Sequence, residues 1–183
     1  MLKSHSVFIL VAMTIFFASL FLSANVIMAE TIRGTSNNDN LTGTAYNDHI
    51  TGGRGNDTLI GLGGNDIIDG GSGKDNVKGS EGDDYIIGGS GNDTISGDIG
   101  DDQIEGNSGS DDIEGGNGDD VLLGGLGDDI LYGQEGNDNL FGGPGEDILS
   151  GGNGSDYFDC GRGQDKVLDF NFNEGDSRAD NCE

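Results

Sequence analysis

The chain has 183 residues, of which 37 are glycine and only one is proline, and it carries a formal net charge of −26. Glycine does not stand at every third position, which excludes a collagen-like chain, and the composition also departs from that of a mixed α/β core. The negative charge argues against nucleic acid as a partner, because a phosphate backbone would be repelled instead of releasing counterions.

The first 29 residues have the layout of a secretory signal peptide. A basic residue, Lys3, precedes an apolar run over residues 7–29, and charge and glycine begin abruptly at Glu30. The small residue Ala29 marks the expected cleavage point. An uncleaved anchor is the alternative, because about 20 apolar residues are enough to span a bilayer. Polar residues interrupt the run and favour cleavage. We therefore expect a secreted, extracellular or cell-surface protein without a membrane span in its mature form.

After a short linker predicted at residues 30–33, residues 34–168 repeat with a period of nine. Each unit contains one aspartate, and a large apolar residue stands two positions after it. A glycine stands five positions before each aspartate, replaced once by Cys160, and a second glycine stands two positions before it from Gly55 to Gly163. A register kept over about fifteen units is a structural period. No stretch after residue 30 has apolar residues at helical spacing, so we expect almost no helix.

Written out, residues 52–60 read G-G-R-G-N-D-T-L-I, which is the pattern G-G-x-G-x-D-x-U-x with U a large apolar residue. In this motif the chain resembles the RTX, or haemolysin-type, calcium-binding repeat family over residues 34–168. The resemblance implies an all-β fold, a parallel β-roll or β-solenoid. In that fold a six-residue glycine turn and a three-residue strand make half a coil, so two nonapeptide units make one coil.

The β-roll that the resemblance implies would stack the aspartates of every second unit. Two bare carboxylates about 4.8 Å apart repel each other by roughly 3 kcal/mol at an effective dielectric constant of 20. A divalent cation between them reverses the sign, and calcium accepts carboxylate and carbonyl oxygens in a flexible cage. We therefore expect Ca²⁺ as the cofactor and folding that depends on it. The predicted ligands are Asp57, Asp66, Asp75, Asp84, Asp93, Asp102, Asp111, Asp120, Asp129, Asp138, Asp147, Asp156 and Asp165.

The first two units differ, because Asn37 and Tyr46 replace the second glycine. Terminal repeats commonly act as caps, so their aspartates are left out of the ligand set. Some units also carry two adjacent acids, such as Asp101-Asp102. We interpret the second acid as the ligand and the first as solvated surface. A disordered acidic tail is the alternative explanation of the charge, but such tails do not keep apolar residues in fixed phase with their acids.

Two cysteines, Cys160 and Cys182, lie near the end of the chain. In an oxidising compartment an even pair predicts one disulfide, and two free thiols are the alternative. Residues 165–172 alternate apolar and polar side chains, which predicts a strand covering the open end of the solenoid. We expect residues 169–183 to form a C-terminal cap tied down by the disulfide.

The sequence contains no motif that indicates catalysis. It has no H-E-x-x-H, G-x-S-x-G or G-K-[ST] pattern, and His49 is the only histidine after residue 30. We expect an exported calcium-binding protein that is not an enzyme and acts as a structural or cell-surface element. A calcium-dependent adhesin or carbohydrate-binding module, with extracellular or cell-surface polymers as partners, is the main alternative. A small secreted hydrolase is the less favoured one.

Overall fold

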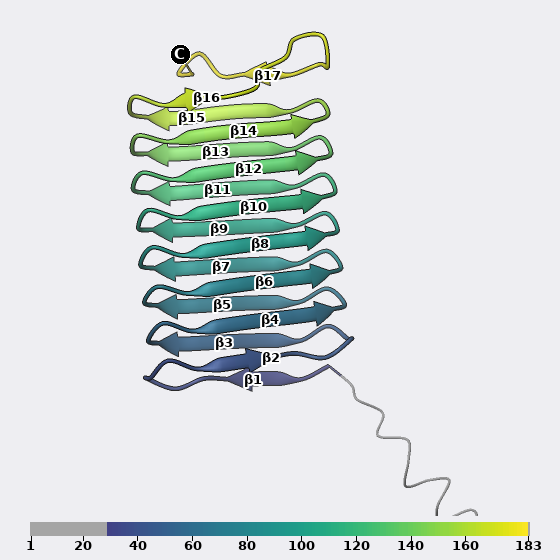
Figure 1. Cartoon of the computed structure of the whole chain (residues 1–183), viewed down its shortest axis with the longest axis vertical. Helices are drawn as coiled ribbons and strands as arrows, with labels where there is room; N and C mark the ends of the chain where they lie inside the picture. The colour runs from purple at the N-terminus through teal and green to yellow at the C-terminus, as the bar shows by residue number, and fades with distance from the viewer. Residues whose placement is uncertain (1–28, 183) are drawn as a thin grey trace, which may run out of the picture.

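The computed structural model describes residues 29–182, which wind into a column of stacked coils (Figure 1). Its strands form two parallel sheets. Sheet A contains, in spatial order, β1 (Thr31–Arg33), β3 (His49–Arg54), β5 (Ile67–Ser72), β7 (Tyr85–Ser90), β9 (Gln103–Ser108), β11 (Val121–Leu126), β13 (Asn139–Pro144), β15 (Tyr157–Arg162) and β17 (Ser177–Arg178). Sheet B contains β2 (Asn40–Thr42), β4 (Thr58–Gly63), β6 (Asn76–Glu81), β8 (Thr94–Ile99), β10 (Asp112–Asn117), β12 (Ile130–Glu135), β14 (Ile148–Asn153) and β16 (Lys166–Val167).

The register of both sheets follows directly from the nine-residue period. Ile68 of β5 pairs with Ile86 of β7, and Val77 of β6 pairs with Ile95 of β8, so partners are eighteen residues apart. The expected all-β parallel β-roll with two nonapeptide units per coil is therefore confirmed. No helix occurs within residues 29–182. Consistent with this, nothing in that range forms an apolar helix long enough to cross a membrane.

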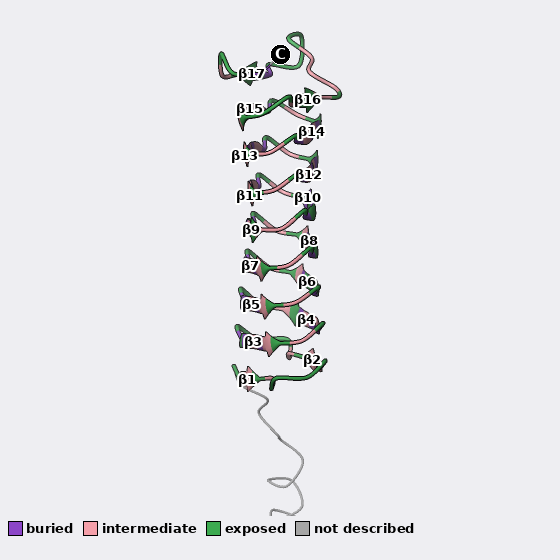
Figure 2. Cartoon of the chain, turned by 90° about the vertical axis from the view of Figure 1, so that its left-hand side faces the viewer, coloured by how far each residue is buried: buried purple, intermediate pink, exposed green. Residues whose placement is uncertain are grey.

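The hydrophobic core is a thin layer between the two sheets (Figure 2). It consists of the apolar residue that follows each aspartate by two positions, because this residue is the central inward side chain of its half-coil. These side chains are almost fully buried from one end of the column to the other: Ile50, Leu59, Ile68, Val77, Ile86, Ile95, Ile104, Ile113, Leu122, Leu131, Leu140, Leu149 and Phe158.

The strands are longer than the resemblance implied. Most have six residues where three were expected, and the turn shrinks to the second glycine, the following residue and the aspartate. The cause is that backbone pairing continues past the first glycine of each unit. Gly71 pairs with Gly89, and Ser72 with Ser90, at the end of their strands. The first half of the supposed glycine turn thus belongs to the sheet.

Residues 30–33 were expected to be a linker, but Thr31–Arg33 form strand β1 of sheet A. Ile32 pairs with Ile50 and packs against the core, so it occupies the position of the apolar repeat residue. Three residues, Thr31–Arg33, are too few to reveal the nine-residue period. Residues 1–28, and with them most of the predicted signal peptide, lie outside the described residues.

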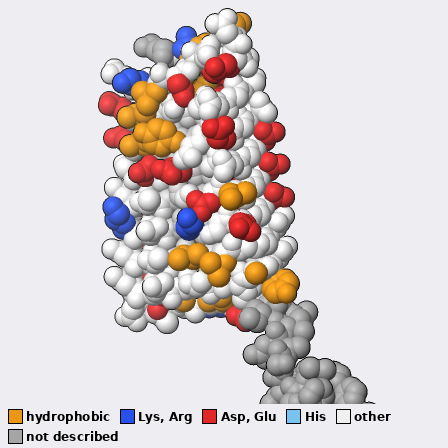
Figure 3. Space-filling view, turned by 45° about the vertical axis from the view of Figure 1, so that its right-hand side comes forward, with side chains coloured by type: hydrophobic (Ala, Val, Ile, Leu, Met, Phe, Trp, Pro, Cys, Tyr) orange, Lys and Arg blue, Asp and Glu red, His pale blue; other side chains and the backbone are white. Residues whose placement is uncertain are grey.

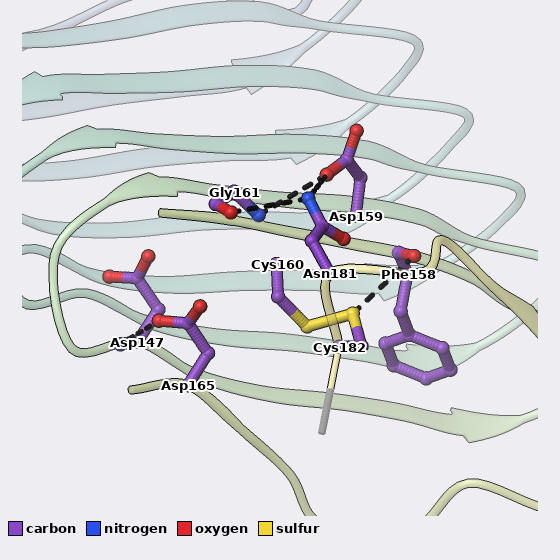
Figure 4. Close-up of a disulfide and its surroundings, with 8 residues drawn as sticks. All are labelled: Asp147, Phe158, Asp159, Cys160, Gly161, Asp165, Asn181 and Cys182. Carbon is purple, nitrogen blue, oxygen red and sulfur yellow. Dashed lines mark hydrogen bonds between the residues drawn. A yellow bond between two sulfur atoms is a disulfide. The ribbon is translucent and has the colours of Figure 1, made fainter. Parts of the chain in front are cut away.

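The C-terminal cap is not one strand, as residues 165–172 had suggested. Lys166–Val167 form β16 and pair with β14, residues 168–176 cross the top of the column, and β17 closes sheet A beside β15. Within the cap, Phe170 packs edge-on against Phe158, with ring centroids 6.2 Å apart. The disulfide between Cys160 and Cys182 is confirmed, and both cysteines lie in the core cluster (Figure 4).

Candidate metal centre

Each repeat aspartate is the last residue of a turn and is followed at once by a strand, so the aspartates form one row along each edge of the column. The row leading into sheet A runs from Asp48 to Asp156, and the row leading into sheet B runs from Asp39 to Asp165. Twelve of the thirteen predicted ligands, Asp57 to Asp156, are at most 2% exposed. Asp165, at the end of its row, is only half-buried.

One oxygen of each of these carboxylates is satisfied by the neighbouring coil. The backbone N–H of Asp84 donates to Asp102 Oδ1 at 2.8 Å, and the backbone N–H of Asp75 donates to Asp93 Oδ1 at 2.8 Å. The same contact joins successive aspartates along both rows up to Asp147 and Asp165. The stacked carboxylates are therefore separated by backbone amides, which reduces the direct repulsion that we expected between them.

The second carboxylate oxygen has no hydrogen-bond partner among residues 29–182. Oδ2 of all twelve aspartates from Asp57 to Asp156 is buried without a hydrogen bond. An unsatisfied buried polar atom is destabilising, and more so when it carries charge. The fold thus presents two rows of anionic oxygens that require a cation or a proton.

At the first glycine of each unit from Gly52 to Gly142, a backbone carbonyl oxygen and the orphan carboxylate oxygen face the same small space. A Cβ atom added to Gly70 would stand 2.7 Å from Asp75 Oδ2 and 2.5 Å from the carbonyl oxygen of Gly88. The same two kinds of oxygen would stand 2.5 Å from a Cβ atom at Gly52. The space therefore excludes a side chain and is lined by oxygen. Carboxylate and carbonyl oxygens are the ligands that calcium prefers, so the donor set fits this ion.

Cys160 is the one residue that replaces this first glycine after residue 33. Its side chain fits because the coil above it is incomplete. Strand β17 ends at Arg178 and pairs only with the first residues of β15, so Cys160 has no paired strand on that side. The disulfide between Cys160 and Cys182 occupies the space beside Cys160 where no strand is paired.

No three His, Cys, Asp or Glu side chains of residues 29–182 converge on one point. A cation in these turns would consequently be held by carboxylates of neighbouring coils together with backbone carbonyls, and not by a cluster of side chains within one loop.

Burial raises the pKa of the repeat aspartates from Asp66 to Asp156, because desolvation disfavours the charged form. The backbone hydrogen bond to each carboxylate acts in the opposite direction, and the charges of neighbouring aspartates raise the pKa further. The pKa is raised to about 7 for Asp102, Asp120 and Asp129. It is raised to about 6 for Asp66, Asp84, Asp93 and Asp138.

The acids that precede the buried aspartates form a second ladder, which sequence reasoning missed. The backbone N–H of Asp119 donates to Asp101 Oδ1 at 2.9 Å, and that of Asp101 donates to Asp83 Oδ1 at 3.1 Å. These side chains are exposed along the edge of the column (Figure 3), but they are not merely solvated surface as we had interpreted them. Asn65 and Asn137 belong to the same ladder, because their Oδ1 atoms also accept backbone hydrogen bonds from the next coil. The frequent occurrence of Asn or Asp just before the buried aspartate is the sequence feature that could have predicted this ladder.

The two ends of the rows differ from the middle. Asp39 Oδ2 accepts hydrogen bonds from the backbone and hydroxyl of Thr35, and Asp48 Oδ2 accepts one from the backbone of Thr44. These oxygens need no cation, which agrees with leaving both residues out of the ligand set. At the other end, Asp176 extends the sheet A row.

Asp176 is a residue of the sheet A row that sequence reasoning did not place there, and both of its carboxylate oxygens accept backbone hydrogen bonds. It is 5% exposed. Its Oδ1 accepts the backbone N–H of Asp156 at 3.1 Å and its Oδ2 that of Asn171 at 2.7 Å. Two additional residues shift it out of the nine-residue period, and only the preceding Gly175 marks the turn.

Comparison with protein families gives one result. The family model described as the RTX calcium-binding nonapeptide repeat matches the chain in four copies, at residues 33–68, 69–104, 105–140 and 132–167. Together the copies cover well over half of the chain. No curated protein matches the sequence.

Proposed function

Because the chain belongs to the RTX calcium-binding nonapeptide repeat family, we propose that it is an exported protein whose β-roll folds when calcium binds in the aspartate turns. We propose further that the folded roll serves as a structural or cell-surface element. The repeats of this family bind calcium. The strands form the expected β-roll, and the aspartates are stacked in its turns. The proposal concerns the dependence of folding on the ion and the place where the protein acts.

The observation that carries the proposal is the set of twelve buried Oδ2 atoms without a hydrogen-bond partner. Asp57 to Asp156, and Asp165 at the end of its row, would supply carboxylate oxygens to calcium, and the first glycines of the units would supply carbonyl oxygens. Bound calcium would neutralise the two rows. The protein contributes the rigid ladder that places the oxygens, because Oδ1 of each carboxylate is already fixed by a backbone amide.

The thin core supports a role for calcium in folding itself. Each half-coil contributes one fully buried apolar side chain, while the glycine-rich turns lose much conformational freedom when they order. A ligand that binds the folded state and not the unfolded state stabilises folding, and metal sites made of separate turns exist only in the folded chain.

An extracellular location is supported by two features. The apolar segment at residues 1–29 has the layout of a signal peptide, and the cap contains a disulfide, which persists in oxidising compartments. Extracellular calcium modules typically bind calcium in the range of about 10⁻⁴ to 10⁻³ M. We also propose that the protein has no catalytic activity, since its sequence contains none of the catalytic motifs considered above.

Circular dichroism of the purified chain during a calcium titration tests the proposal. We expect a disordered spectrum in excess chelator, a cooperative rise of β-structure as calcium is added, and a much weaker response to magnesium, which demands a stricter octahedral geometry. Calorimetry would give the number of bound ions. A complete β-spectrum in chelator at neutral pH, unchanged by calcium, would contradict the proposal.

A second candidate function, a calcium-dependent carbohydrate-binding or adhesive module, is favoured by one observation. The outer face of sheet B carries a polar groove, and part of its lining is a column of side chains at a repeat position that sheet A fills almost entirely with glycine.

A further inference from the structure

The second residue of each repeat unit lies in a left-handed backbone conformation in both sheets, with φ of +74° to +126° wherever the strands are complete. Glycine adopts this conformation without steric conflict, whereas other residues are disfavoured there. Sheet A uses glycine at this position with the single exception of Asn107. Sheet B instead carries side chains at Leu62, Ser80, Asp98 and Gln134, and glycine only at Gly116 and Gly152.

The four strained residues form one column, because their strands pair in register. Leu62 pairs with Ser80 and Ser80 with Asp98. Gly116 pairs with Asp98 below it and with Gln134 above it. Gly116 has no side chain that could cover the strand surface between Asp98 and Gln134, and it lines the same groove as these two residues. Strained conformations of this kind concentrate at functional sites.

The column lines a groove of about 510 Å³ on the outer face of sheet B. A hydrogen-bond network crosses it. Lys78 Nζ lies 2.7 Å from Asp98 Oδ2, and the Ser96 hydroxyl donates to Asp98 Oδ1 at 2.8 Å. One coil further on, Gln134 Nε2 donates to Glu114 Oε2 at 3.2 Å. The groove therefore presents hydrogen-bond donors and acceptors on successive coils.

Apolar side chains stand beside these polar groups. Leu62 is 46% exposed and Ile99 is 53% exposed, and both line the groove. Basic, acidic and hydrophobic side chains thus lie next to one another on the surface of the column (Figure 3). Such a surface offers apolar contact together with directional hydrogen bonds.

We propose that this groove binds a neutral, polyhydroxylated ligand, namely an extended oligosaccharide that lies along the column across successive coils. Sugar hydroxyl groups both donate and accept hydrogen bonds, which matches the mixed network, while the C–H faces of the rings pack on apolar side chains. The spacing of the coils, about 4.8 Å, is close to the length that one pyranose residue adds to an extended glycan.

The charges of the groove favour a neutral ligand over an ionic one. An acidic polymer would be repelled by the formal charge of −26, which calcium in the buried turns offsets only in part. A basic polymer would find Lys78 in the groove, and Asp98 and Glu114 already engaged by neighbouring donors. The inference rests on the proposed function in one respect, because the groove exists only in the folded, calcium-loaded coil.

Calorimetry of the calcium-loaded full chain with neutral gluco-, manno- and galacto-hexasaccharides tests the proposal. We expect at least one of them to bind, with an affinity that does not change with NaCl concentration. The variants Asp98→Gly and Gln134→Gly should weaken this binding at least tenfold. Both should keep or raise the thermal unfolding midpoint, because glycine relieves the strained conformation.

Asn107→Gly is the matched control, because it relieves the same strain at the same repeat position in sheet A. It should bind the sugar like the wild type. The proposal is overturned if no hexasaccharide binds to the folded protein, if Asn107→Gly weakens binding as much as the groove variants, or if only basic polymers bind and salt abolishes their binding. Circular dichroism of the same samples separates these outcomes from failure of calcium-dependent folding, which would remove the groove and the proposed function together.

Discussion

At the residue scale, adjacent acids in one turn have different environments. Asp102 is buried with one unsatisfied oxygen, whereas Asp101 is exposed and accepts a backbone hydrogen bond from Asp119. The same side-chain type therefore presents an unpaired oxygen in one position and fixes the turn backbone in the next.

This difference predicts unequal effects of two matched substitutions. Asp102→Asn removes an anionic ligand at the centre of the sheet A row, and it should raise the calcium concentration needed for folding about tenfold, equivalent to about 1.4 kcal/mol, with fewer ions bound. Asp101→Asn keeps the acceptor for Asp119 and should have little effect. Circular dichroism titration and calorimetry of both variants provide the measurement, and equal effects of the two would argue against ligand function of the buried row.

The first glycine of the unit gives a second prediction at this scale. A methyl group at Gly70 would collide with the carbonyl oxygen of Gly88 and with Asp75 Oδ2, so Gly70→Ala should destabilise the calcium-loaded protein by about 1–3 kcal/mol. Ser72→Ala, at an exposed position of the same strand, is the control and should be neutral. Denaturant unfolding in saturating calcium measures both. If Gly70→Ala left the free energy of unfolding unchanged, the space at Gly70 would have room for a methyl group, contrary to the geometry described.

At the element scale, the two ends of the column are finished differently. At the start, β1 and β2 are short strands of three residues, and Thr35 and Thr44 donate hydrogen bonds to Asp39 and Asp48, the first aspartates of the two rows. At the other end, the cap covers the core with Phe170 and is held by the disulfide (Figure 4). Unpaired edges of repeat proteins need such protection.

The disulfide should stabilise the last coils more than the first. It closes a loop with a sequence separation of 22 residues, which contributes roughly 3 kcal/mol in the chain-entropy model. In the double variant Cys160→Ser/Cys182→Ser, hydrogen exchange should accelerate first in β14, β15 and the cap, while the first coils change little. Exchange measured by mass spectrometry in saturating calcium checks this, and a uniform acceleration along the chain would contradict it.

At the scale of the whole molecule, the rows couple folding to pH in opposite directions with and without calcium. The pKa of seven buried aspartates in the folded chain is raised from 3.8 to about 6 or 7, so the folded state binds more protons than the unfolded state. The metal-free roll is therefore favoured below about pH 4 and loses this stabilisation as the pH rises through about 6 to 7. Calcium needs the ionised form and competes with these protons.

Two titrations check this coupling. In chelator, β-structure should increase as the pH is lowered from about 8 to about 4. In calcium, the midpoint calcium concentration should rise as the pH falls from about 8 to about 5, because protons displace the ion. Circular dichroism measures both. A calcium midpoint independent of pH over this range would show that the buried carboxylates are not the ligands.

The sequence by itself determined the coil, because the aspartate, the apolar residue and the first glycine keep one phase over the whole repeat. The resemblance to the repeat family added that two units make one coil, so the stacking of the aspartates, the core line and the disulfide could be predicted from residues such as Asp102, Leu122 and Cys160.

Only the tertiary structure decided features that depend on contacts between residues eighteen or more positions apart. It showed that a backbone amide takes one oxygen of each carboxylate and leaves the other free, and that Asp101 and Asp119 form a second ladder. It placed Asp176 in the sheet A row despite its shift from the period. It also separated the strained side chains of sheet B from the glycines of sheet A. These features do not follow from the local pattern, because they depend on contacts between coils and on which units fall into which sheet.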